Sequence, residues 1–306
     1  MIRFFLHRLL ALLPVAFGVA TLTFALIHLV PGDPVIAMLG ENAAPVDIAG
    51  MRHQLGLDRP LAVQYAAYLG GVIHGDLGSS IAYHEPVRSL IAARYPATME
   101  LAAAGLAVAI LIAFPLGLVA GARPGGAVDF GAMAFAILGI SVPHLYLGPL
   151  LMIVFSLHLG WFPLTGRGGL AHLVLPAVTM GTAMAGILAR MLRQSLVRVR
   201  DADLIRTARS KGLSEFHALA AHGVRNALTP VLSLLGLQAG ALLTGSIVVE
   251  IIFSWPGIGR LMIEAIGLRD YPLAQGCVLV FALTYVMVNL LTDVAYSLID
   301  PRVRLG

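Results

Sequence analysis

Residues 101–122 read LAAAGLAVAILIAFPLGLVAGA, a stretch without a single Asp, Glu, Lys or Arg. A helix needs about 20 consecutive apolar residues to cross the hydrocarbon core of a bilayer. Five further windows share this lack of charge, and each is at least 22 residues long: Leu9–Gly32, Phe130–Gly166, Gly168–Ala189, Asn226–Val249 and Tyr271–Thr292. The windows do not alternate with a period of two, which argues against a membrane β-barrel. The sequence therefore predicts an all-α membrane protein with six transmembrane helices.

The composition of the whole chain agrees with these windows. Of its 306 residues, 58% are hydrophobic and only 12% are charged. A soluble domain carries about 25% charged residues. The chain therefore lacks the polar side chains to cover a soluble globule, and it is too apolar to be disordered.

The first window could also be the apolar region of a signal peptide, because Arg3 and Arg8 precede it. Such regions are about 7–15 residues long and end at a site of small residues. This window is longer, and Pro31-Gly32-Asp33-Pro34 follows it instead. We therefore expect a first span that is retained in the mature protein.

The distribution of basic residues predicts the orientation of the spans. Six spans place the two termini on one side, together with most of the basic residues: Arg3, Arg8, Arg123, Arg198, Arg200, Arg206, Arg209, Lys211, Arg225, Arg302 and Arg304. The short loops of the other side hold only Arg167, Arg260 and Arg269. Because cytoplasmic loops are enriched in Lys and Arg, both termini are expected in the cytoplasm. The basic residues then serve as topology signals and contacts with anionic lipid, so no nucleic-acid partner is expected.

The most polar stretch of the chain, 198–225, contains a short predicted helix. Asp203 stands near its start, where the helix dipole favours an acid, and Gly212 suits the position after its end. Ser214 can cap a second helix. A short helix between two spans can pack on little except a partner protein, whereas the alternative is a solvated basic loop that obeys the positive-inside rule.

Residues Ile205–Leu213, followed by His222–Pro230, resemble the EAA motif of bacterial ABC importer permeases of the dipeptide, oligopeptide and nickel branch. Arg206-Thr207-Ala208 stands where the family has Glu-Ala-Ala, so the glutamate is absent, and Gly212 takes the place of the motif's glycine. Further stretches resemble the same branch in order along the chain: Pro31–Pro34, Leu55–Pro60, Gly75–Ser80, Pro96–Leu101, Phe253–Gly259, Arg269–Pro272 and Asp300–Arg304. The long first external segment is typical of the B-type member of the permease pair.

The resemblance implies the type I ABC importer permease fold. Residues 1–30 would form the cytoplasmic N-terminus and first transmembrane helix, and 31–94 an external, periplasmic segment. Residues 95–298 would form the core with five helices and a cytoplasmic coupling helix at 203–213. Residues 299–306 would form a cytoplasmic tail. The implied location is the inner (plasma) membrane of a bacterial cell, crossed several times.

The resemblance also implies the partners. They are a second homologous permease subunit, two cytoplasmic ATPase subunits, a periplasmic or extracellular substrate-binding protein and membrane lipid. The chain holds one lysine, Lys211, and no G-x-x-x-x-G-K-[ST] loop. We therefore expect ATP and Mg to be bound by the partner ATPase subunits, and no catalytic, cofactor-binding or metal-binding residues in this chain, which makes it a non-catalytic permease subunit.

Three groups of site residues follow. The group that would couple to the ATPase consists of Asp203, Leu204, Arg206, Thr207, Ala208, Gly212 and Leu213. Polar residues within or near the spans are candidates for the translocation path, and these are Glu250, Gln238, Asn289 and His144. Candidates that would face the binding protein are Trp255, Arg260, Arg269 and Asp270. For Glu250, pairing with Arg260 or a backbone amide is the structural alternative.

The predicted function is to form half of the translocation path for a di- or oligopeptide-type substrate in an ATP-driven importer. Glutathione and a nickel chelate are alternatives within the same class. An ion-coupled secondary transporter is the rival class, although it would need charges at the bilayer midplane and usually a repeat. The single cysteine, Cys277, is predicted to be a small buried hydrophobic residue.

Overall fold

The computed structural model describes residues 13–25, 35–36, 44–54, 56–200, 202–219 and 223–299. The predicted turn at Pro31–Pro34, the tail Asp300–Arg304 and the two terminal groups of arginines lie outside these residues. Contacts divide the chain into two compact units. The first unit comprises residues 98–255 and those from 287 onward, and the second comprises residues up to 97 and 256–286.

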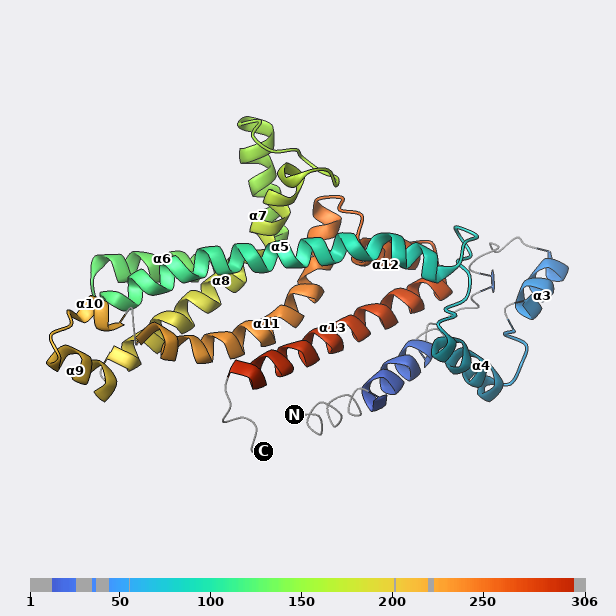
Figure 1. The fold of residues 1–306 in the computed structure, drawn as a ribbon. Coiled ribbons are helices and arrows are strands. Elements are labelled where there is room, and N and C mark those ends of the chain that lie inside the picture. Colours follow the sequence, from blue (N-terminus) through green and yellow to red (C-terminus); the bar gives the residue numbers. More distant parts are fainter. Residues whose placement is uncertain are drawn as a thin grey trace. The chain divides into compact units, whose positions relative to one another are not determined.

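Helices make up most of both units (Figure 1). Those of the second unit are Leu13–Ala25, α3 (Pro45–Gln54), α4 (Leu61–His74) and α12 (Ile258–Gly267). Those of the first unit are α6 (Ala127–Ser141), α7 (His144–Leu151), the π-helical turn η1 (Met152–His158), α8 (Leu170–Arg200), α9 (Asp203–Ser210), α10 (Glu215–Ala218) and α11 (Val224–Ile252). Two long helices, α5 (Val87–Ala122) and α13 (Tyr271–Ile299), contribute to both units.

Four of these helices are long and apolar enough to cross a membrane: Val87–Ala122, Leu170–Arg200, Asn226–Ile252 and Tyr271–Thr292. A bent helix pair can form a fifth span, and Leu13–Ala25 is a shorter apolar helix within the first predicted window. The prediction of an all-α membrane protein is confirmed, and the count of six helices is compatible with the described residues.

The third charge-free window differs from the single span that its length predicts. It is broken into α6 and the pair α7–η1, which are bent by 104° relative to each other. Val142 is extended, with φ −87° and ψ 113°, because the ring of Pro143 disfavours a helical conformation in the residue before it. The helix is thus completely broken at Pro143. By contrast, α5 continues through Pro115.

Close contact of helices through small residues holds the first unit together. A β-carbon on Gly186 of α8 would collide with the backbone carbonyl oxygen of Ala136 in α6. A β-carbon on Gly181 would lie 2.5 Å from the carbonyl oxygen of Gly105 in α5. Because lipid offers little hydrophobic drive for helix association, close packing of this kind supplies much of the attraction. The glycines thus fix how near α5 and α6 lie to α8.

In the second unit, α4 packs on helix Leu13–Ala25. The hydroxyl groups of Thr21 and Tyr65 are hydrogen-bonded at 2.6 Å, and the ring of Phe24 lies 5.2 Å from that of Tyr65 and 5.7 Å from that of Tyr68. Burial raises the pKa of Tyr68 to about 12, so its phenol is neutral at physiological pH. The two tyrosines thus form the half-buried face of α4.

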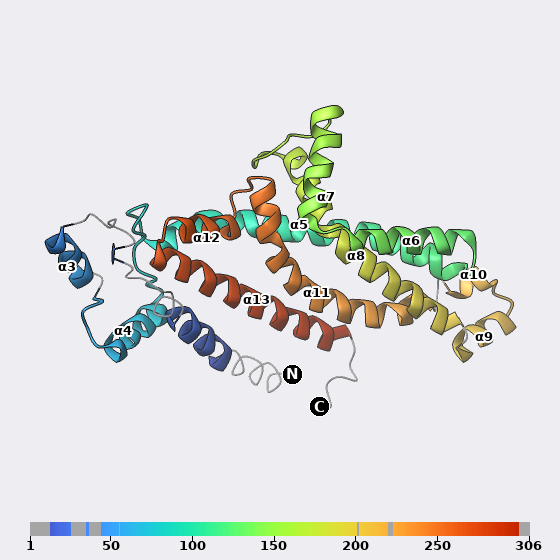
Figure 2. The same ribbon diagram turned by 180° about the vertical axis from the view of Figure 1, so that it is seen from behind.

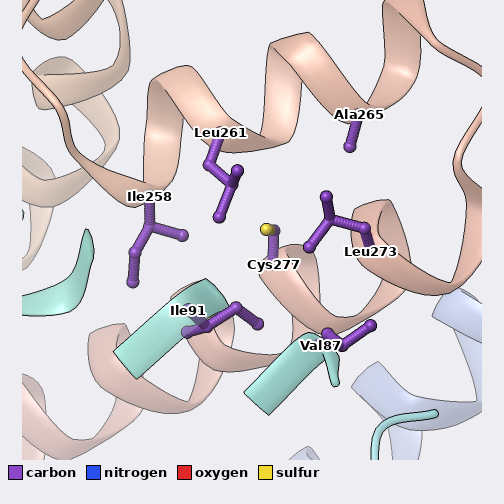
Figure 3. Packing of buried hydrophobic residues seen from close by; sticks show 7 residues of the cluster. All are labelled: Val87, Ile91, Ile258, Leu261, Ala265, Leu273 and Cys277. Carbon is purple, nitrogen blue, oxygen red and sulfur yellow. The ribbon is translucent and has the colours of Figure 1, made fainter. Parts of the chain in front are cut away.

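A hydrophobic cluster joins α5, α12 and α13 within the second unit (Figure 3). Its buried members are Val87, Ile91, Ile258, Leu261, Ala265, Leu273 and Cys277. The sulfur of Cys277 points into the centre of this cluster. The prediction of a buried cysteine that acts as a small hydrophobic residue is confirmed.

Candidate coupling site and buried polar positions

The stretch after α8 folds into α9, a glycine turn and α10 (Figures 1 and 2). The amide of Leu213 donates to the carbonyl of Ala208 at 3.3 Å, and the amide of Gly212 donates to that of Arg209 at 3.0 Å. These two bonds form a Schellman motif, which requires a left-handed residue at the position of Gly212. Gly212 has φ +92°. The predicted helix end is therefore confirmed, and a β-carbon there would be strained.

The inner face of α9 packs on the chain itself. Ile205 and Ala208 are buried with Ala218 and Leu219, and Val199 at the end of α8 packs against this group. Ala208, expected to contact the ATPase, therefore points inward and can only support such a contact. Ile205 was missed by sequence reasoning, although its spacing of three from Ala208 marks the same helix face.

The remaining predicted residues are exposed, four on the outer face of α9 and two in the turn after it: Asp203, Leu204, Arg206 and Thr207, then Gly212 and Leu213. The side chains of Asp203 and Arg206 pair at 3.2 Å on the surface. Leu204 and Leu213 are thus exposed apolar side chains among the basic residues Arg209 and Lys211. Such a surface can enter an apolar cleft rimmed by acidic groups on another protein.

Sequence reasoning missed an ion pair at the start of α6, in which the carboxylate is buried and the arginine is half-buried. Arg193 of α8 donates from Nε to Oδ1 of Asp129 at 2.7 Å and from Nη2 to Oδ2 at 2.6 Å. The amide of Gly125, in the turn before α6, donates to Oδ2 at 2.9 Å. The carboxylate therefore accepts three hydrogen bonds. An acid in the first turn of a helix was the available signal, but its partner lies 64 residues away.

The four translocation-path candidates have separate surroundings. Glu250 is fully buried, and it accepts hydrogen bonds from Thr98 Oγ1 at 2.7 Å and Ser246 Oγ at 3.4 Å. His144 donates from Nδ1 to the carbonyl of Thr179 at 2.9 Å. Gln238 of α11 and Asn289 of α13 are half-buried. Glu250 thus shows the surroundings of a structural carboxylate, with hydroxyl donors supplied by its own chain.

Two of the four side chains expected to face the binding protein are buried. Trp255 has no exposed surface, and Arg167 lies over its ring at 6.0 Å from the centroid. Asp270 accepts hydrogen bonds from Ser80 Oγ at 2.5 Å and from the amides of Ile81 and Ala82 at 3.0 Å. These two expectations are corrected, because an enclosed side chain cannot touch a partner.

The other two candidates remain at the surface. Arg260 is partly exposed and pairs with Glu264 at 2.7 Å, and Arg269 is exposed in a left-handed conformation with φ +56°. In the motif Arg269–Pro272, Asp270 therefore has a structural role in place of the expected contact with the binding protein. Asp270 ties the turn at Ser80 to the start of α13, where it also accepts a hydrogen bond from the amide of Leu273 at 3.1 Å.

Several apolar spans, small-residue packing and a capped amphipathic helix between two spans are features of a helical membrane protein with a surface outside the bilayer. Residues 113–305 match the family described as "Binding-protein-dependent transport system inner membrane component". Residues 1–102 match the corresponding N-terminal family. The chain therefore belongs to the family of binding-protein-dependent transport system inner membrane components, and it is an ABC importer permease of the dipeptide and oligopeptide branch.

Curated relatives cover almost the whole chain. It is 43% identical over 304 residues to the "Glutathione transport system permease protein GsiC" of Salmonella choleraesuis strain SC-B67, with 99% of each chain covered. The proteins of the same name from Pectobacterium atrosepticum strain SCRI 1043 and Escherichia coli strain K12 are 42% and 41% identical over the same coverage.

Solved structures of ABC transporters share the fold at low sequence identity. A crystal structure of an amino acid ABC transporter with histidines matches with a TM-score of 0.53 and 17% identity, covering 70% of this chain and 94% of that chain. An inward-facing structure of the MetNI methionine ABC transporter matches with a TM-score of 0.54 and 15% identity, covering 69% and 96%. These likenesses show the fold alone.

Family membership has three consequences. The chain is a non-catalytic, multi-pass permease subunit of the bacterial inner membrane. It works with an ATPase, a substrate-binding protein and a second permease, as its class does. The rival class, an ion-coupled secondary transporter, is thereby set aside.

Proposed function

We propose that this permease forms half of the translocation path for glutathione or a closely similar short peptide. The observation that carries the proposal is the 43% identity over 99% of both chains to a permease named for glutathione transport. Dipeptides and longer peptides are the second candidate, because the chain belongs to the peptide branch of the family. A nickel chelate is a further alternative cargo and is included in the same test.

We further propose that α9 is the coupling helix, that two cytoplasmic ATPase subunits dock beneath the permease pair, and that those subunits bind ATP and Mg. Both termini would lie in the cytoplasm, and residues 31–94 would form an external, periplasmic segment. Support for α9 comes from its exposed Leu204, from the exposed Leu213 in the turn after it, and from its basic rim and capped end. The core would span 95–298, with a short tail at 299–306.

The cargo is tested with the complete complex in lipid discs, with its binding protein added. ATPase stimulation is measured with glutathione, dipeptides, longer peptides and nickel chelates. We expect glutathione to stimulate most. If only another class of compound stimulates the ATPase activity, that class replaces glutathione as the proposed cargo. Purification without any ATPase would contradict the proposed assembly.

The coupling helix is tested by Gly212→Val, which places a branched side chain at φ +92°. We expect normal membrane insertion and loss of transport driven by ATP hydrolysis. Gly75→Val is the matched control, because Gly75 also ends a helix with φ +74° and also has open space around its β-carbon position. Normal transport by Gly212→Val would contradict the assignment of α9.

A further inference from the structure

We propose that the Asp129–Arg193 ion pair is the link through which movement of α9 reaches α6, so that both residues are positioning residues for coupled transport. The proposal rests on the proposed role of α9 as the coupling helix. It adds a specific contact that carries the movement from the α8–α9 end into the start of another span.

The geometry of the pair suits this task. The guanidinium of Arg193 uses two nitrogens to bind the two oxygens of Asp129 at 2.6 and 2.7 Å. Such a fork is directional, and sliding α8 against α6 would break both bonds together. Asp129 is buried, and its third hydrogen bond comes from the amide of Gly125. The carboxylate therefore joins α8, the first turn of α6 and the turn that precedes it.

The path from α9 to this pair is short and stiff. Arg193 lies seven residues before the end of α8 at Arg200, about 10 Å along a helix axis. In the last turn of α8, Val199 packs with Ile205, Ala208, Ala218 and Leu219, so α9 and the end of α8 share one hydrophobic cluster. A force on α9 thus displaces the end of α8. The bonds from Arg193 to Asp129 then pass that displacement to α6.

Apolar packing alone would transmit this force less well. Farther along the same two helices, Gly186 lies against the carbonyl oxygen of Ala136 and brings α6 and α8 close together. Contacts of this kind resist compression but allow small sliding motions, of the type seen in shear movements of packed helices. The two hydrogen bonds between Arg193 and Asp129, at the end of the α6–α8 contact, prevent this sliding.

The first experiment uses the complete complex in proteoliposomes and compares Asp129→Asn and Arg193→Lys with wild type. The measured quantity is substrate transported per ATP hydrolysed, at equal content of co-purified ATPase. We expect Asp129→Asn to lower this ratio about tenfold, within the usual range of couplings between sites. Arg193→Lys keeps the charge but loses the fork, and we expect a smaller decrease.

The matched control is the exposed pair of Glu100 and Arg167 in the same unit, changed to Glu100→Gln and Arg167→Lys. We expect the transport ratio of both controls to equal that of wild type. An equal ratio in both Asp129→Asn and Arg193→Lys would overturn the proposal. If Asp129→Asn does not assemble, Arg193→Lys decides: a lowered ratio supports the link, and an unchanged ratio overturns it.

A second readout follows the movement directly. Spin labels are placed at the exposed positions Val128 of α6 and Ala202 before α9, with buried Cys277 replaced by Ala. We expect the distance between the labels to stay constant through the ATP cycle in wild type and to change in Arg193→Lys. A distance that also changes in wild type would overturn the link.

The outcomes separate this proposal from the role of α9. If Gly212→Val transports normally, the assignment of α9 as the coupling helix fails. If Gly212→Val uncouples transport while both changes in the ion pair leave it intact, only the proposed link fails.

Discussion

Two ion pairs of the first unit have nearly the same chemistry and very different surroundings. Arg193 binds both oxygens of Asp129, whereas Arg167 binds a single oxygen of Glu100 at 2.6 and 2.8 Å. The side chains of Asp129 and Arg193 are 6% and 29% exposed, and those of Glu100 and Arg167 are 39% and 41% exposed. Water can replace the partners of the exposed pair and not those of Asp129. The comparison teaches that burial, more than distance, makes an ion pair a fixed mechanical contact.

The largest expected effect comes from breaking the buried pair. Asp129→Asn leaves Arg193 without its charged partner, and we expect a loss of about 3 kcal/mol in stability. The measurement is the thermal unfolding midpoint of the complex in lipid discs at a fixed heating rate. A midpoint equal to that of Glu100→Gln would remove the difference between the two pairs.

The second effect tests how much the close contact between α6 and α8 contributes to stability. Gly186→Ala forces α8 away from the carbonyl of Ala136, and we expect it to cost about 2 kcal/mol. Gly131→Ala in α6 is the control, because its new β-carbon would meet nothing within 4 Å. The measurement is the thermal unfolding midpoint of each variant. Equal midpoints would show that the close approach of α8 to α6 at Gly186 does not contribute to stability.

The buried carboxylate of Glu250, which accepts hydrogen bonds from two hydroxyl groups, gives an intermediate case. Thr98→Val removes the hydroxyl that donates to Glu250 at 2.7 Å, and we expect a loss of about 1 kcal/mol. The same thermal measurement applies, with Thr98→Ser as the variant that keeps the donor. If Thr98→Ser is destabilised as much as Thr98→Val, the effect comes from packing and not from the hydrogen bond.

The smallest effect is expected at the exposed pair. Glu100→Gln should change stability by at most about 0.5 kcal/mol, because solvent screens both partners. The difference from wild type should shrink further when the salt concentration is raised, since screening shortens the range of surface charges. A loss that persists at high salt would show that this pair is enclosed in the assembled complex.

Much of the fold was predictable because a bilayer imposes simple requirements. Charge-free windows predicted the apolar helices, and Asp203 and Gly212 predicted both ends of α9 through local chemistry. The third window was predicted as one span, since its length and apolar character do not reveal the 104° bend. Pro143 marks the position of the break, but the angle depends on what α7 packs against.

The candidate site was predictable only in part. Motif position identified Leu204 and Thr207, which are exposed on α9, and Leu213, which is exposed in the turn after it. It did not distinguish them from Ala208, whose side chain is buried, and it expected exposure of Trp255 and Asp270, which are enclosed. A motif records that a residue type recurs at a position, whereas burial depends on segments that are distant in sequence.

Motifs along the sequence carried the resemblance to ABC importer permeases. By itself, the sequence also determined that this is a membrane protein with apolar spans and a capped helix between two of them. Those properties follow from local composition, from helix geometry and from the cost of placing charge in lipid. Only the tertiary structure decided that Asp129 meets Arg193, that Glu250 meets Thr98 and that Asp270 meets Ser80. Each of these carboxylates is buried and needs donors, and which donors it finds depends on the packing of helices far apart in the chain.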